Sequence, residues 1–281
     1  LMTGYAGFAA IIPDYVGYGS SNSSDHPYLL KDLSAQNSLD MITASMKYME
    51  DSGVVLNYQL YISGYSQGGH IAMALAEKIE KDFDFEMLDL KGVAPMAGPY
   101  LISSFGDAVL KADANMSVPA FMAYIADSYS NSYDNISLDE MIVSSKVSDF
   151  DGLFDGNNDI TAIHTALLLP LGAPTLGLFD AIFVSEYEAT PSHKLRERFK
   201  ENNVGSWAAQ TKLNLIHCTN DDVVPYTMTQ GVKQTLEAFG AVDVTLTPIS
   251  SVADGNVHSD CGTPAYTQAI GWFDAIRQGN I

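Results

Sequence analysis

The sequence has little positive charge: 14 lysines and arginines stand against 34 aspartates and glutamates, for a formal net charge of -20 at pH 7. Nucleic acid and anionic membrane surfaces repel so acidic a chain, and we expect neither as a partner. Long apolar runs are also missing. The longest apolar stretch, residues 166–184, is interrupted by prolines and glycines, and no run reaches the length of a transmembrane helix.

Charged residues make up only 17% of the chain and apolar residues 47%, a composition that excludes a disordered protein. The 281 residues are enough to bury one large α/β core, alone or with a cap. An EF-hand loop is also missing, because in the oxygen-rich cluster at residues 149–159, which surrounds Gly152 and Gly156, no glycine and distal glutamate fall at the required positions. We expect a solvated turn there, with calcium as the alternative, and no metal or cofactor elsewhere. The cluster comprises Asp149, Asp151, Asp155, Asn157 and Asp159.

The most informative stretch that is present surrounds Ser66. A β-forming apolar run at residues 58–62 leads into Gly64-x-Ser66-x-Gly68, and an alanine-rich helical pattern follows over residues 71–78. A serine on a tight turn between a strand and a helix is the context of a catalytic nucleophile, and the flanking glycines permit the strained backbone. Ser66 is therefore the candidate nucleophile. An ordinary turn in which this serine caps the helix is the alternative.

The other elements alternate between strands and helices. Buried strands are predicted at residues 7–13, 90–96, 212–218 and 242–249, and helices at 33–49, 226–239 and 263–278. Between residues 100 and 210 this rhythm is lost, and helical fragments alternate with polar loops. We therefore predict an α/β fold with a doubly wound, mostly parallel sheet. Its core comprises residues 1–99 and 211–281, and a helical cap, residues 100–210, is inserted after the strand that ends near Met96.

A nucleophilic serine needs a base to accept its proton and a carboxylate to orient that base. In sheets of this type the three groups follow successive strands in the order Ser, Asp, His, and the sites form at the carboxyl ends of the strands. Asp221 and Asp222 follow the strand that ends at Cys218, and His258 follows the next one. Both aspartates are candidates for the acid, and His258 is the candidate base.

Together these motifs resemble the α/β-hydrolase superfamily. Ser66 lies in Gly-Tyr-Ser-Gln-Gly-Gly, Asp221 in His-Cys-Thr-Asn-Asp-Asp-Val-Val-Pro, and His258 before the last helix. Residues 13–19 (Pro-Asp-Tyr-Val-Gly-Tyr-Gly) and 26–29 (His-Pro-Tyr-Leu) resemble the secreted lipase and esterase branch of that superfamily. The resemblance covers the chain apart from the cap. It implies Ser66 as nucleophile, His258 as general base and Asp221, ahead of its rival Asp222, as the acid.

The resemblance also implies one oxyanion-hole donor, the backbone N–H of Gln67. In this family the second donor precedes the strand expected at Phe8, so it lies outside this chain. We therefore expect the first strands of the sheet to be missing, and a preceding segment or a second chain to cover the outer side of residues 8–12. Candidate substrate contacts are Tyr65, Tyr15, His26, Leu168 and Phe179.

The expected activity is hydrolysis of a small-molecule carboxylic ester or lipid through an acyl-enzyme. The apolar cap residues 166–183 are expected either to line an acyl pocket or to form ordinary cap core. Two other functions stay open. One is a serine exopeptidase, in which Glu186 and Glu188 are available to bind an α-amino group, and the other is a catalytically inactive binding protein.

The two cysteines each lie three residues from a proposed catalytic residue. A hydrogen bond between Asp221 and His258 would bring Cys218 and Cys261 within reach of each other, so we predict a disulfide between them. Two buried free cysteines are the alternative. A disulfide favours a compartment outside the cytosol, and we expect a secreted or periplasmic protein, as the resemblance also implies.

Overall fold

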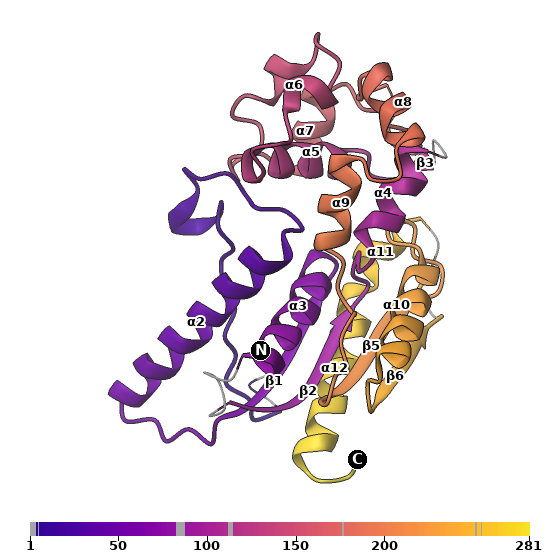
Figure 1. Cartoon of the computed structure of the whole chain (residues 1–281). Helices are drawn as coiled ribbons and strands as arrows, with labels where there is room; N and C mark the ends of the chain where they lie inside the picture. The colour runs from indigo at the N-terminus through magenta and orange to yellow at the C-terminus, as the bar shows by residue number, and fades with distance from the viewer. Residues whose placement is uncertain are drawn as a thin grey trace. The chain divides into compact units, whose positions relative to one another are not determined.

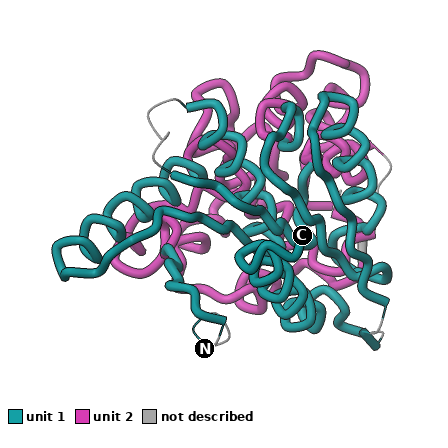
Figure 2. The backbone as a smooth tube through the Cα atoms, turned by 90° about the horizontal axis from the view of Figure 1, so that it is seen from below, with its two compact units in different colours: residues 1–13, 34–100, 204–281 teal, residues 14–33, 101–203 magenta. Residues whose placement is uncertain are grey.

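The computed structural model of the chain (Figure 1) describes residues 4, 6–82, 88–111, 115–175, 177–250, 252–253 and 255–281. The chain divides into two compact units (Figure 2). Unit 1 comprises residues 1–13, 34–100 and 204–281, and unit 2 comprises residues 14–33 and 101–203. In this division the glycine-rich loop at 14–33 belongs with the inserted segment.

Unit 1 contains a parallel sheet of four strands among the residues described. The strands are β1 (Gln59–Tyr65), β2 (Asp89–Met96), β5 (Lys212–Cys218) and β6 (Val244–Ile249), in the spatial order β1-β2-β5-β6. Each coincides with a predicted strand to within a few residues. The predicted α/β fold with a parallel sheet is therefore confirmed.

The helices of unit 1 alternate with the strands along the chain. They are α3 (Gln67–Lys81), α10 (Tyr226–Phe239), α11 (Val257–Asp260) and α12 (Gly262–Arg277), and α2 (Lys31–Asp51), which comes before the first strand, β1, begins in unit 2 and continues into unit 1. One face of the sheet, with Met96, Ile216 and Cys218, packs on Ala265 and Phe273 of α12. Because side chains alternate along a strand, Val93, Leu213 and Leu215 lie on the opposite face. No helix in the described part of the chain is long and apolar enough to cross a membrane.

The strand predicted at residues 7–13 is wrong. These residues form no strand, and Ile12 is 83% exposed. Phe8 instead packs its ring against Tyr61 of β1 and Phe273 of α12, with centroid separations of 5.2 and 6.5 Å. Apolar composition alone cannot make a strand, because a strand also needs a neighbouring ladder of hydrogen bonds. Within the described residues β1 pairs with β2 alone, and no ladder reaches residues 8–12.

Unit 2 is mainly helical. Its elements are α4 (Ile102–Leu110), α5 (Ala120–Ser132), α6 (Leu138–Met141), α7 (Ile160–Ala166), α8 (Ala181–Ala189), α9 (Lys194–Glu201), the short turns η1 (Gly19–Ser21) and η3 (Val147–Phe150), and the paired β3 (Asn115–Met116) and β4 (Ala173–Pro174). Tyr129, Tyr187 and Phe199 are buried in its core. Ser128 of α5 donates a hydrogen bond to the carbonyl of Tyr28, which fastens the glycine-rich loop to this unit.

Candidate active site

Ser66 lies between the end of β1 and the start of α3, in a strained backbone conformation with φ 56° and ψ -120°. Its N–H donates to the carbonyl of Met96 at 2.9 Å, and its carbonyl accepts from the N–H of Gly69 at 2.8 Å. A Cβ atom at Gly64 would lie 2.1 Å from the carbonyl oxygen of Gly68, so only glycine fits there. Strand, strained serine and helix together form the turn on which α/β-hydrolases carry a nucleophile.

His258 lies between Ser66 and Asp221. Its Nε2 is 2.8 Å from the Oγ of Ser66, and its Nδ1 is 2.8 Å from Oδ2 of Asp221. A carboxylate can only accept, so Nδ1 carries the hydrogen and Nε2 is left to accept from the serine hydroxyl. All three residues belong to unit 1 and follow β1, β5 and β6. The structure thus brings together the three residues that the sequence singled out.

The side chain of Asp221 is fully buried. Its Oδ1 accepts from the backbone N–H groups of Val223 and Val224 at 2.9 and 2.8 Å. Its Oδ2 accepts from His258 and, at 3.1 Å, from Nε2 of His217. Burial raises the pKa of this carboxyl, but the hydrogen bonds from His217 and His258 outweigh burial and hold the pKa well below its usual range. Asp221 is therefore ionised and fixed in position.

Asp222, the rival acid, has a different partner. Its Oδ1 accepts from the backbone N–H of His258 at 2.8 Å. The neighbouring carboxylates thus hold the histidine at two points: Asp221 binds the imidazole and Asp222 binds the backbone.

Tyr65 fixes the same loop from the end of β1. Its hydroxyl donates to the carbonyl oxygen of His258 at 2.6 Å, and the two ring centroids lie 5.2 Å apart. Burial, assisted by the charges of Asp221 and Asp222, raises the pKa of Tyr65 above its usual range, so the phenol remains a donor. The sequence indicates Tyr65 only as a candidate substrate contact and does not reveal its hydrogen bond to the loop that carries His258.

Cys218 and Cys261 form a disulfide, with a Cα–Cα distance of 6.2 Å, so the predicted bridge is confirmed. It joins the last residue of β5 to the residue before α12, and both cysteines are buried. Asp221 comes three residues after one cysteine and His258 three residues before the other. The bridge therefore ties together the loops that carry the two groups.

Sequence reasoning missed the contact that His217 makes. Its ring is fully buried and lies between Asp221 and Thr229, with Nδ1 2.6 Å from the Oγ1 of Thr229. The available signal was its place as the penultimate residue of β5, next to the disulfide and four residues before Asp221.

The remaining predicted substrate contacts all belong to unit 2. His26 is buried and donates from Nδ1 to the carbonyl of Val16 at 2.7 Å, and Tyr15 stacks on its ring. Phe179 is buried in the core of this unit, and Leu168 is 78% exposed. Of the four, Leu168 is the side chain that presents most of its surface to solvent.

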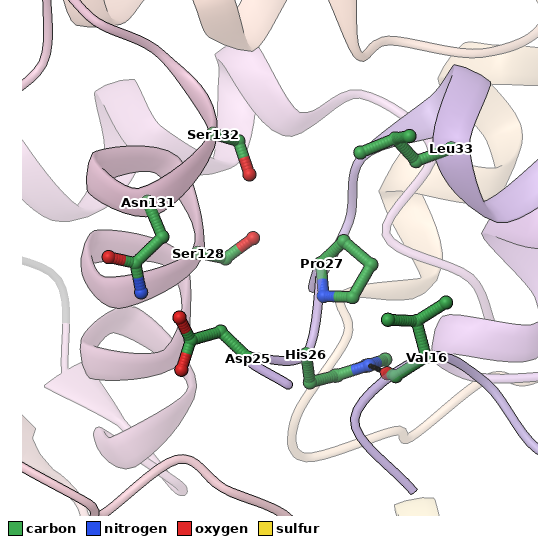
Figure 3. Close-up of a pocket in the computed structure, with 8 residues that line it drawn as sticks. All are labelled: Val16, Asp25, His26, Pro27, Leu33, Ser128, Asn131 and Ser132. Atoms are coloured by element: carbon green, nitrogen blue, oxygen red, sulfur yellow. Dashed lines mark hydrogen bonds between the residues drawn. The ribbon is translucent and has the colours of Figure 1, made fainter. Parts of the chain in front are cut away.

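A pocket of about 290 Å³ lies within unit 2, beside His26 (Figure 3). Figure 3 shows the carboxylate of Asp25 directed toward the helix that carries Ser128 and Asn131. On that helix Asp127 accepts a hydrogen bond from Asn131 at 3.3 Å, and burial together with Asp25 raises the pKa of Asp127 to about 7. The lining residues are Val16, Asp25, His26, Pro27, Leu33, Ser128, Asn131 and Ser132.

The oxygen-rich cluster at residues 149–159 forms turns. Asp155 accepts hydrogen bonds from Asn157, and Asp159 accepts from the backbone N–H of Ala162 at the start of α7. Across the described ranges, no three histidine, cysteine or acidic residues are grouped so that they could hold a metal ion.

The parallel sheet, the strained serine turn and the Ser66–His258–Asp221 contacts define an α/β-hydrolase of the lipase and esterase class. The sequence matches the secretory lipase family over residues 3–280, and the chain belongs to that family. It is accordingly a carboxylic-ester hydrolase. A comparison with curated proteins found no match.

Several solved structures share the fold. An esterase from Xanthomonas oryzae, LipA, described as rice cell wall degrading, is 24% identical, with a TM-score of 0.78 over 94% of this chain and 69% of its own. A Legionella pneumophila protein assigned as a hydrolase is 22% identical, with a TM-score of 0.82 over 96% of this chain and 70% of its own. Candida antarctica lipase A in its closed state is 14% identical, with a TM-score of 0.64 over 87% of this chain and 56% of its own.

Proposed function

We propose that the chain hydrolyses carboxylic esters through a covalent acyl-enzyme on Ser66. The observation that carries this proposal is the continuous path of hydrogen bonds from Ser66 through His258 to Asp221, both at 2.8 Å. The Oγ of Ser66 attacks the carbonyl carbon while Nε2 of His258 accepts its proton, and the leaving alcohol then takes that proton. A water molecule, deprotonated by the same nitrogen, attacks the acyl carbon. The bond from that carbon to Oγ of Ser66 then breaks, Nε2 returns the proton to Oγ, and the acid leaves.

The backbone N–H of Gln67 is our candidate donor to the oxyanion of the tetrahedral intermediate. Gln67 directly follows the nucleophile and is the first residue of α3, a helix of 15 residues. The partial positive charge at a helix N-terminus favours negative charge that develops nearby.

We propose a small-molecule ester or lipid with an apolar acyl chain as the substrate. The cap stretch at residues 166–183 contributes side chains both to the core of unit 2 and to its surface, and Leu168, Leu171 and Ile182 are each at least 70% exposed. If these side chains contact the acyl chain, each added CH₂ is worth about 0.8 kcal/mol, or about fourfold in kcat/KM. Values of kcat/KM for a series of p-nitrophenyl esters from acetate to octanoate measure this gain. Equal values across the series would show that residues 166–183 do not contact the acyl chain.

Turnover of the wild type and of Ser66→Ala tests the proposal. The wild type should hydrolyse p-nitrophenyl acyl esters, and the Ser66→Ala protein should fold, as judged by circular dichroism, yet lose this activity. Aminoacyl anilides in the same panel test for an exopeptidase. A wild-type protein inert toward both classes would favour a binding protein.

We also propose that the protein works outside the cytosol, in the periplasm or the extracellular space. The disulfide and membership of a secretory family support this location. Non-reducing mass spectrometry of protein recovered from its natural compartment tests it, since two free thiols per chain would contradict the assignment.

A further inference from the structure

His217 is a second histidine on the carboxylate of Asp221. It comes from β5, four residues before that aspartate, and its ring has no exposed surface. Its Nε2 lies 3.1 Å from Oδ2 of Asp221, and its Nδ1 lies 2.6 Å from Oγ1 of Thr229, a buried residue of α10. The ring of Tyr226 meets it edge to face at 5.6 Å between centroids.

The direction of each hydrogen bond follows from the chemistry of the partners. The carboxylate of Asp221 can only accept, so Nε2 of His217 carries the hydrogen. The Thr229 hydroxyl can act as the donor to Nδ1, so the two hydrogen bonds together hold the ring of His217 in one orientation. The resulting path runs from Thr229 through His217 to Asp221 and on to His258.

The two histidines share one oxygen. Oδ1 of Asp221 is already held by the backbone N–H groups of Val223 and Val224, while Oδ2 accepts from both His217 and His258. The bond from His217 therefore fixes where Oδ2 lies relative to the imidazole of His258. It also takes part of the oxygen's negative charge, which weakens the attraction of Oδ2 for the proton on His258.

We propose that His217, held by Thr229, is a positioning residue for ester hydrolysis: it aligns Oδ2 of Asp221 with His258 and moderates how strongly that oxygen holds the imidazole proton. This inference rests on the proposed role of Ser66, His258 and Asp221. A purely structural histidine, present only to fill the core, would affect folding and not the pH dependence of the reaction.

Other titratable groups also face this network. Asp222 accepts from the backbone N–H of His258, Tyr65 donates to its carbonyl, and Tyr226 packs on the ring of His217. Burial raises the pKa of both tyrosines, so they remain protonated through the range of an activity profile. The substitutions below leave all three groups in place.

The test compares matched variants by kcat, KM, the pH profile of kcat/KM and thermal unfolding. His217→Leu removes the donor, and we expect kcat to fall about 10- to 100-fold with KM little changed, as for the loss of a hydrogen bond to a charged group. The acidic limb of the His217→Leu profile should move to higher pH, because Oδ2 then carries more negative charge and favours the positively charged imidazolium form of His258. His217→Gln retains an amide donor and should recover part of the loss.

The Thr229 pair tests the same path without altering the histidine. Thr229→Val should shift the profile in the same direction by a smaller amount, and Thr229→Ser, which keeps the hydroxyl, should stay nearer to the wild type. Thr235→Val is the control, because Thr235 is on the same helix and its hydroxyl bonds to the carbonyl of Gly231. That control should leave kcat and the profile unchanged.

Unchanged kcat and pH profile in folded Thr229→Val and His217→Leu, with only lower melting temperatures, would overturn the inference. If His217→Leu does not fold, the comparison of Thr229→Val with Thr229→Ser tests the inference by itself. Ser66→Ala and Asp221→Asn run in the same assay identify which proposal fails. Activity retained in those two would refute the proposed function, whereas activity lost in them but unchanged in the His217 and Thr229 variants would refute only the positioning role.

Discussion

The nucleophile and the acid–base pair are held in place by different means. Ser66 is fixed by its own backbone, between a strand and a helix that are adjacent in sequence, and Gly64 leaves room for the turn. His258 and Asp221 are 37 residues apart and are held by side chains from several elements and by a disulfide. Local geometry therefore determines one part of the site, and long-range contacts determine the other.

This difference predicts how each part fails. A side chain added at Gly64 in the serine turn should damage the backbone and hence the fold, because the turn connects β1 to α3. A change in the acid and base loops should first disturb the alignment of two side chains, while the sheet remains. The following experiments separate these two kinds of damage.

The largest effect is expected at the acid. Asp221→Asn should lower kcat by about 10⁴-fold, because an amide can donate to Nδ1 and so favours the wrong imidazole tautomer. Asp222→Asn is the matched control: it retains an oxygen for the backbone N–H of His258 and should cost less than tenfold. Steady-state kinetics of both folded variants measures the two losses in kcat. A larger loss in Asp222→Asn than in Asp221→Asn would mean that Asp222 is the acid.

Removing the disulfide tests the connection between the two loops. The Cys218→Ala, Cys261→Ala double variant should lose about 4 kcal/mol of unfolding free energy, since the bridge closes a loop across a separation of 43 residues. Urea denaturation of oxidised wild type and variant gives the difference. Equal midpoints would show that the other contacts hold the loops without the bridge.

A methyl group at Gly64 tests the serine turn. Gly64→Ala should destabilise the fold by about 1–3 kcal/mol and abolish turnover, because its Cβ would meet backbone of the same turn. Gly271→Ala is the control, since a Cβ there meets no atom within 4 Å and alanine is favoured at this exposed position of helix α12. Thermal unfolding should shift in opposite directions for the two variants. A Gly64→Ala protein of wild-type stability would contradict the structural need for glycine.

A smaller effect concerns acid stability. The pKa of Asp221 is held well below the ordinary carboxyl value near 4, so its contribution to stability is present above that value and is lost as the pH falls through the folded-state pKa. The stability difference between wild type and Asp221→Asn should therefore narrow as the pH falls from about 5 toward 2. A difference independent of pH would show that the charge of Asp221 is not stabilised in the fold.

The difference between local geometry and long-range contacts also explains how much of the molecule could be predicted from the sequence. The strands from Gln59 onward and the turn at Ser66 depend on local periodicity and on glycine, and both are visible in a single sequence. The roles of His217 and Tyr65 depend on which residues meet across the fold, and no local pattern reveals such contacts. The strand expected at residues 8–12 failed for the same reason, because pairing is a property of the sheet and not of the segment.

Covalent labelling identifies the nucleophile without relying on turnover. The protein is treated with a fluorophosphonate, digested, and mapped by mass spectrometry, beside Ser66→Ala and Asp221→Asn. We predict one label per wild-type chain, on the peptide that contains Ser66, slow labelling of Asp221→Asn and no labelling of Ser66→Ala. A label on another residue, or equal labelling of Ser66→Ala, would contradict it.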